Sequence, residues 1–405
     1  MYFPKDEYEQ RWSRLHDEMA RRGFETAVIW QRTGGGYDRA GDVWYLSNYA
    51  AQNNGQEPST TGVGQAFAAL LVRRGEEPEL HVLRADYSLI ESIERDHLAV
   101  ERIEEDPDNL ATGVARRLNE LGIEGRVAYV GDDFLPIEMY RALVVDTPSI
   151  EWVPQDDLLY PLQRRKSPRE IDLFREIGEV AARALNAFMD GLIRGDRQCD
   201  AASRAAAIIV AAGGGFQRLG CHAGPRGDRS AWDYPLYGYS RVAPKPGEIV
   251  RAWVIGPILE GYWLAPGSTS VCGLEPTPNQ KRLVEDTVGI IEDFMAAMQP
   301  GRTPREVGRL CDAVVERRGY SVDQSGGLYG HGYSTFWSGP VIPGGGFDPG
   351  SDPFWMADEP LQNGEVITAE MFIFEPDVGN VGFEEPLIVW DDRVERLTDA
   401  TKVYW

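Results

Sequence analysis

Residues 163–171 read Gln163-Arg164-Arg165-Lys166-Ser167-Pro168-Arg169-Glu170-Ile171, and this polar stretch divides the chain into two parts. Ser167 is placed to cap a helix that has Pro168 at its first position and Glu170 at its third, the pattern of a capping box. The pattern predicts a long helix over residues 168–192. We therefore predict a domain boundary near residue 160, with one domain over residues 1–160 and a second over residues 161–405.

The first part alternates between helical and strand patterns. Residues 8–22 form an amphipathic pattern with Trp12, Leu15 and Met19 on one face, and Gly23 ends it. Apolar runs at residues 26–30, 66–72, 80–83 and 126–131 predict strands, and residues 110–121 predict a helix. Such alternation is typical of a layered α/β domain.

The second part contains more strands and more glycine. After the long helix we expect strands over residues 249–255, 259–264, 366–374 and 386–390. Two further helices are predicted over residues 278–298 and 303–318. The predicted fold class is therefore α+β, with a small α/β N-terminal domain followed by a larger α+β domain.

Composition excludes several functional classes. The net charge of −23 argues against nucleic-acid binding, which requires clustered Lys and Arg. No stretch approaches the roughly 18–20 apolar residues that cross a bilayer, and the N-terminus lacks the pattern of a signal peptide. The four cysteines are widely spaced and suit a reducing compartment. We therefore expect a cytoplasmic protein with no membrane or nucleic-acid partner.

Several stretches resemble motifs of the creatinase/prolidase family, and they occur in the family's order. They are Val43-Trp44-Tyr45-Leu46-Ser47-Asn48-Tyr49, Lys166-Ser167-Pro168-Arg169-Glu170-Ile171, Lys245-Pro246-Gly247-Glu248, Glu260-Gly261-Tyr262, Gln299-Pro300-Gly301, Tyr329-Gly330-His331-Gly332, Gly364-Glu365-Val366-Ile367-Thr368-Ala369-Glu370 and Gly382-Phe383-Glu384-Glu385-Pro386. The resemblance implies a pita-bread C-terminal domain, in which two pseudo-symmetric halves surround a deep pocket. It also implies a homodimer.

The resemblance implies a two-metal site made of two Asp, one His and two Glu. At the two Asp positions this chain has Val254 and Ala265. The other three positions match His331, Glu370 and Glu384, and a shift of one residue would put Glu385 in place of Glu384. Because apolar residues replace two anionic ligands, we expect no bound metal and no other cofactor. A single metal on His331, Glu370 and Glu384 is the alternative.

A loop that begins at Cys221 and His222 contains further candidates for substrate binding, in the place where family members build the rim of the pocket. The alternative is an ordinary solvated loop. The family has a further His upstream of these motifs, and its position here corresponds to Leu236 or Tyr237. Tryptophans close to the motifs could bind a cationic ligand through cation–π contact. The predicted substrate-binding residues are His222, Arg226, Asp228, Asp233, Tyr237, Trp337 and Glu385.

Creatinase, a member of the family, works without metal on a guanidino compound. The leading hypothesis is accordingly a metal-independent hydrolase or lyase that cleaves a C–N bond in a small, cationic molecule. In this hypothesis Glu370 and Glu384 bind the cation, and His331 transfers the proton. The alternatives are a non-catalytic pita-bread protein that binds a ligand or partner, and a mononuclear metallo-hydrolase or Xaa-Pro-type aminopeptidase.

Overall fold

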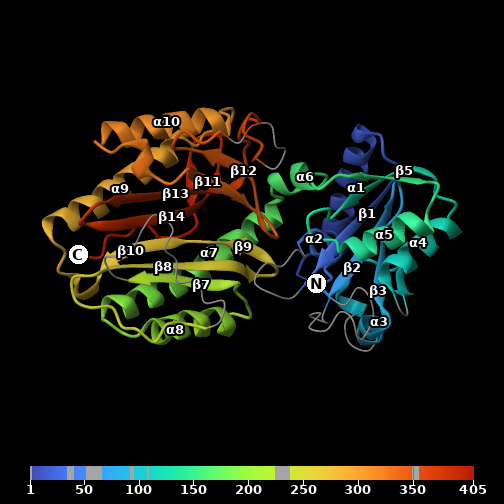
Figure 1. The fold of residues 1–405 in the computed structure, drawn as a ribbon, viewed down its shortest axis with the longest axis horizontal. Helices are drawn as coiled ribbons and strands as arrows, with labels where there is room; N and C mark the ends of the chain where they lie inside the picture. The colour runs from blue at the N-terminus through green and yellow to red at the C-terminus, as the bar shows by residue number, and fades with distance from the viewer. Residues whose placement is uncertain are drawn as a thin grey trace. The chain divides into compact units, whose positions relative to one another are not determined.

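The computed structural model describes residues 2–33, 41–51, 66–91, 95–106, 109–223, 238–348, 350 and 355–405. The chain forms two compact units, Met1–Leu162 and Gln163–Trp405 (Figure 1). Each unit has its own sheet and its own helices. The predicted fold class, a small α/β unit followed by an α+β unit, is confirmed.

A six-stranded mixed sheet forms the N-terminal unit, in the order β4-β3-β2-β1-β5-β6. Strand β2 is antiparallel to β1 and β3, whereas β1–β5, β5–β6 and β3–β4 are parallel pairs. The strands are β1 (Thr26–Arg32), β2 (Phe67–Arg73), β3 (Glu79–Leu83), β4 (Ile103–Asp106), β5 (Gly125–Val130) and β6 (Ile150–Pro154). The helices are α1 (Lys5–Arg22), α2 (Gly41–Ser47), α3 (Arg84–Leu89), α4 (Leu110–Glu120) and α5 (Ile137–Asp146), with a short 3-10 helix at Arg95–His97.

The predicted capping box is present at the start of the second unit. The Ser167 hydroxyl accepts a hydrogen bond from the Glu170 backbone N–H (3.1 Å), and the Glu170 carboxylate accepts one from the Ser167 N–H (2.8 Å). The long helix α7 (Pro168–Ile193) begins there, as predicted. It follows the short helix α6 (Tyr160–Arg164), and α8 (Gln198–Ala211), which the sequence reading missed, comes next.

A nine-stranded sheet forms the C-terminal unit. Its main path runs β12-β11-β13-β14-β10-β8-β7, while β15 pairs with β14 and β9 pairs with β8. The strands are β7 (Arg218–Ala223), β8 (Ile249–Leu259), β9 (Tyr262–Leu264), β10 (Gly267–Val271), β11 (Leu328–Tyr333), β12 (Trp337–Pro343), β13 (Val366–Glu375), β14 (Gly379–Val389) and β15 (Val394–Arg396). The remaining helices are α9 (Pro278–Ala297) and α10 (Pro304–Arg317), with short 3-10 helices at Cys272–Leu274 and Val322–Gln324.

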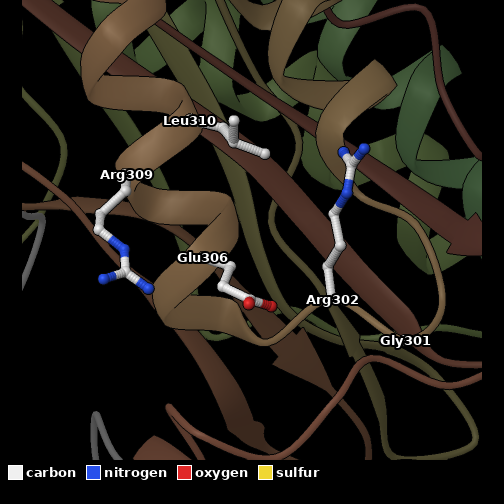
Figure 2. Close-up of a pocket in the computed structure, with 5 residues that line it drawn as sticks. All are labelled: Gly301, Arg302, Glu306, Arg309 and Leu310. Carbon is white, nitrogen blue, oxygen red and sulfur yellow. The ribbon is translucent and has the colours of Figure 1, made fainter.

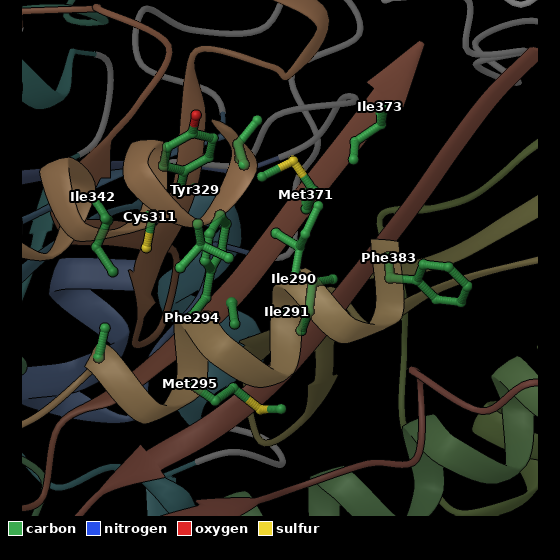
Figure 3. Packing of buried hydrophobic residues seen from close by; sticks show 14 of the residues in the cluster. Ile290, Ile291, Phe294, Met295, Cys311, Tyr329, Ile342, Met371, Ile373 and Phe383 are labelled. Carbon is green, nitrogen blue, oxygen red and sulfur yellow. The ribbon is translucent and has the colours of Figure 1, made fainter. Parts of the chain in front are cut away.

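Alternation along β13 and β14 separates a packed face from a polar one. Met371 and Phe383 belong to a buried cluster with Ile291 and Phe294 of α9 and Cys311 of α10 (Figure 3). Because successive side chains of a strand point to opposite faces, the neighbours Glu370 and Glu384 face the other side of the sheet. Helix packing on one face therefore fixes the strands that present carboxylates on the other.

Two further features concern the helices and the cysteines. Among the residues that the structure describes, none of the helices has the length and apolarity that crossing a membrane requires. The four cysteines, all in the described part of the chain, form no disulfide.

A buried histidine in the N-terminal unit lies between two carboxylates. His81 Nδ1 is 3.1 Å from Asp106 Oδ2, and His81 Nε2 is 3.1 Å from Glu79 Oε1. All three side chains are buried. Because an ionised carboxylate only accepts hydrogen bonds, both ring nitrogens must carry a proton. His81 is therefore an imidazolium in this arrangement.

Arginines from neighbouring segments complete the charge balance around this histidine. Arg117 donates to both oxygens of Glu79, Arg102 also donates to Glu79, and Arg116 donates to Asp106. Burial opposes the charged ring, but hydrogen bonds to Asp106 and Glu79 outweigh it and raise the pKa of His81. The native state thus holds the His81 proton more tightly than the unfolded chain does.

We expect this proton to make stability depend on pH. The raised pKa of His81 contributes stability that is complete below the unfolded value of about 6.5 and is lost as pH rises through the folded value. His81→Gln should cost about 3 kcal/mol at pH 6 and should flatten the decline in the free energy of unfolding above that pH. Urea unfolding followed by tryptophan fluorescence measures this. His97→Gln, at an exposed site, should keep the wild-type decline, and an unchanged decline in His81→Gln would contradict the assignment.

Candidate functional site

Three side chains from neighbouring strands meet on the polar face of the C-terminal sheet. His331 comes from β11, Glu370 from β13 and Glu384 from β14. Glu370 and Glu384 are directly opposite in the β13–β14 register. One ligand atom from each of the three residues lies within 4.8 Å of the others. The structure thus brings together the three residues that the sequence predicted as catalytic.

Two neutral donors hold the Glu384 carboxylate. The Trp253 indole N–H donates to Oε2 at 2.8 Å, and the Tyr333 hydroxyl donates to Oε1. Oε1 also lies 3.4 Å from His331 Nε2. Burial, and then the charge of Glu384, raise the pKa of Tyr333 far above its usual value, so its hydroxyl stays protonated. The orientation of Glu384 is therefore set by its neighbours.

His331 has a defined tautomer. Its Nδ1 lies 3.1 Å from the Gly332 carbonyl oxygen, which only accepts hydrogen bonds, so Nδ1 carries a proton. Nε2 consequently points toward the carboxylates. The flanking glycines are required by close packing, because a Cβ on Gly330 would lie 2.1 Å from the Thr368 carbonyl oxygen and one on Gly332 would lie 2.2 Å from that of Gly339. The Gly-His-Gly sequence thus lets β11 approach its neighbours.

Glu370 occupies an unfavourable position for a charged group. It lies deep in the unit, although solvent still reaches part of its side chain. Burial, and then the neighbouring charge of Glu384, raise the pKa of Glu370 well above its usual value. A bound cation or a proton must relieve this repulsion.

The other predicted residues do not join this cluster. Glu385 points away from Glu384, and its carboxylate accepts hydrogen bonds from the Thr398 N–H and hydroxyl and from the Thr401 N–H. Burial raises its pKa to about 7. This position corrects the inclusion of Glu385 among substrate-binding residues, because a strand cannot present adjacent side chains on one face.

His222 and Trp337 lie on strands at the two ends of the sheet path. His222 is buried on β7, opposite Arg251 of β8, and Trp337 begins β12. The remaining predicted residues, Arg226, Asp228, Asp233 and Tyr237, lie outside the described residues. A substrate-binding role for these six residues stays a prediction.

Sequence reasoning did not foresee the two contacts that hold Glu384, although Trp253 was among the tryptophans near the motifs. Tyr333 stands two positions after His331 on the same strand, and this spacing places both side chains on one face, a signal that could have found it. Trp253 carried no such signal, because its link to Glu384 crosses an intervening strand. Val254, the next residue, is fully buried, and Ala265 is buried directly after β9.

A surface depression of about 620 Å³ lies at the start of α10. Figure 2 shows Arg302 and Arg309 on either side of Leu310, with Glu306 between them. Glu306 belongs to the capping box of α10 and accepts from the Thr303 N–H. None of these residues belongs to the His331 cluster, and we assign the depression no function.

The sequence of the C-terminal unit matches the model of metallopeptidase family M24 over residues 172–391. The chain is 22% identical to the Xaa-Pro dipeptidase of Pyrococcus furiosus over 347 residues, which cover 84% of this chain and 90% of the relative. Among solved structures, the Xaa-Pro dipeptidase from Bacillus anthracis superposes with a TM-score of 0.73 at 19% identity, covering 96% of this chain and 97% of the other. The prolidase from Pyrococcus horikoshii gives 0.74 at 18% identity, covering 98% and 99%. The predicted pita-bread architecture is confirmed.

These comparisons correct the predicted function. A metal-independent enzyme for a non-peptide C–N bond is wrong, because the matching family is one of metallopeptidases and the curated relatives are named Xaa-Pro dipeptidases. The prediction gave Val254 and Ala265, at the two positions where the resemblance implies aspartate, more weight than His331, Glu370 and Glu384. The arrangement of His331, Glu370 and Glu384 agrees instead with the metallo-hydrolase alternative.

We expect Glu370 to make the metal-free protein less stable as pH rises. Between the unfolded pKa of about 4.3 and the raised folded value, the native state holds a proton that the unfolded chain lacks. The free energy of unfolding should therefore fall by up to about 1.4 kcal/mol per pH unit from this group. Glu370→Gln should remove that decline, measured by urea unfolding from pH 5 to 8 in the presence of a chelator.

Glu385, whose pKa is about 7, also makes the free energy of unfolding depend on pH in this range. Its effect is the same in wild type and in Glu370→Gln, so it cancels in the difference between them. Glu316→Gln, on the exposed side of α10, is the control and should keep the wild-type decline. If wild type and Glu370→Gln showed the same dependence of the free energy of unfolding on pH, the raised pKa of Glu370 would be contradicted.

Proposed function

This chain belongs to metallopeptidase family M24, and from that premise we propose that it is a metal-assisted hydrolase of short peptides. The observation that carries the proposal is the convergence of His331, Glu370 and Glu384 on one point of the sheet. An imidazole and two carboxylates are a common donor set for a catalytic divalent metal. The names of the curated relatives favour an Xaa-Pro dipeptide as the substrate.

We propose one metal and not two. The family resemblance assigns two further ligands to the positions of Val254 and Ala265, and both of these side chains are apolar and buried. They offer no oxygen or nitrogen to a second cation. The three retained residues fit one metal, because their ligand atoms are close and His331 Nε2 is directed toward the carboxylates.

A divalent metal at this position supplies Lewis-acid polarisation of a carbonyl and a water of lowered pKa. The protein's own residues prepare the place. The Gly332 carbonyl fixes the His331 ring, and Trp253 and Tyr333 fix the plane of Glu384. Outer hydrogen bonds of this kind orient metal ligands and raise affinity. Glu370, whose raised pKa keeps a proton on it in the metal-free protein, would give up that proton and contribute the second negative charge to a bound cation.

The substrate class, the oligomeric state and the location of the protein remain to be tested. We propose a small-molecule substrate, and we retain the homodimer implied by the family resemblance and the cytoplasmic location as predictions. Sedimentation of the purified chain tests the dimer. Cell fractionation tests the location.

Metal content and peptidase activity test the proposed function. Protein incubated with Zn²⁺, Mn²⁺ or Co²⁺ and then desalted should retain about one ion per chain, measured by mass spectrometry of the metal. Loaded protein should release proline from Ala-Pro. His331→Ala and Glu370→Gln should lower both metal retention and hydrolysis by more than the roughly 10- to 100-fold that loss of an outer hydrogen bond costs, because each removes a ligand itself.

Glu385→Gln is the matched control, since it changes the neighbouring carboxyl on the opposite face of β14. It should retain the ion and the activity. Two ions per chain would contradict the one-metal site. Wild-type protein that retains no metal would overturn the proposal, and a bound metal without hydrolysis of any Xaa-Pro dipeptide would indicate the non-catalytic ligand-binding alternative.

A further inference from the structure

The Trp253 indole reaches Glu384 across an intervening strand. Trp253 is directly opposite Gly267 in the β8–β10 register, and Gly267 is directly opposite Glu384 in the β10–β14 register. Directly opposite residues share a face of the sheet. The three residues therefore form one row across three strands. The indole N–H of the first donates to the carboxylate of the last at 2.8 Å.

This reach depends on the missing side chain at Gly267. A Cβ built there would lie 1.8 Å from Trp253 Cε2 and 2.1 Å from Trp253 Nε1. Real Cβ atoms do not approach other atoms so closely, so any side chain would push the indole off its place. Trp253 and Gly267 are thus a matched pair that builds one hydrogen bond.

A second aromatic ring holds the indole in place. Phe372 of β13 stacks on Trp253, with ring centroids 5.3 Å apart and an interplanar angle of 19°. Phe372 itself lies over Gly382 of β14, where a Cβ would be 2.3 Å from the ring. Arg251 adds its guanidinium carbon 6.0 Å from the Phe372 centroid. Trp253 is almost fully buried and has little room to move.

We propose that Trp253 is a positioning residue that, together with Gly267, fixes the Glu384 carboxylate for metal binding. The inference deepens the proposed function and rests on it where metal affinity is concerned. The geometric part of the inference is that the indole orients Glu384. The hydrogen bond and the register through Gly267 support it without reference to a metal. The indole acts through Glu384, and it has no ligand atom of its own to offer a cation.

The metal-free protein gives the first test. Indole ¹⁵N–¹H spectra should contain eleven tryptophan signals, since the chain has eleven tryptophans. Trp253→Phe removes one signal and so assigns it. Glu384→Gln should shift that same signal, because it replaces a charged acceptor with a neutral one, whereas Glu385→Gln should leave it in place.

Zinc affinity, measured by competition with a chelator, gives the second test. Trp253→Phe should weaken binding about 10- to 100-fold, the range seen when an outer hydrogen bond to a metal ligand is lost. Gly267→Ala should weaken it to a similar extent although it removes no polar atom. Trp263→Phe, in the same β-hairpin, is the matched control and should bind zinc like wild type. Circular dichroism of each variant verifies the fold.

The outcomes separate the two proposals. A signal that Glu384→Gln leaves unmoved would falsify the anchoring role of Trp253, whatever the protein does with metal. Wild-type affinity in both Trp253→Phe and Gly267→Ala overturns the positioning role. If wild-type protein binds no zinc, the proposed function and the role in metal binding both fail, and the spectra still decide whether Trp253 anchors Glu384.

Discussion

Two carboxylates directly opposite each other on β13 and β14 are the constraint on which the site depends. Glu370 and Glu384 repel each other, and the sheet register gives them no way to separate. Hydrogen bonds from Trp253 and Tyr333 stabilise the charge of Glu384. Glu370 instead has a raised pKa, which lets it hold a proton. A buried cluster of two facing carboxyl groups with an imidazole directed toward them has the donor atoms that a divalent cation requires.

The packing of the unit explains why the strands cannot relax. The faces of β13 and β14 opposite the carboxylates carry Met371 and Phe383, which are buried against α9 and α10. A shift of one residue in register would move this apolar set to the polar face, a cost that the core does not allow. The hydrophobic core therefore fixes the distance between the two acids, and the acids in turn define the chemistry available to the site.

Features with a local sequence signature could be predicted, whereas contacts that depend on the register of several strands could not. The capping box at Ser167 and Glu170 has a local signature, so the start of α7 was predictable. His331, Glu370 and Glu384 were found through motif order, and the structure brings them together. The contact between Trp253 and Glu384 was not predictable, because it depends on the register of three strands and on an absent side chain at Gly267. The activity was predicted wrongly because the prediction rested on Val254 and Ala265 and gave too little weight to His331, Glu370 and Glu384.

The β10–β14 pairing can form only after most of the chain has left the ribosome. Gly267 and Glu384 are adjacent in the sheet but far apart along the chain, and the cluster residues lie on β11, β13 and β14. Contacts between such distant segments close late, since the entropy of the intervening loop must be overcome first. The N-terminal unit has its own sheet and core and can fold while the rest is synthesised. The emerging polypeptide consequently has no assembled His331–Glu370–Glu384 cluster until β13 and β14 are made.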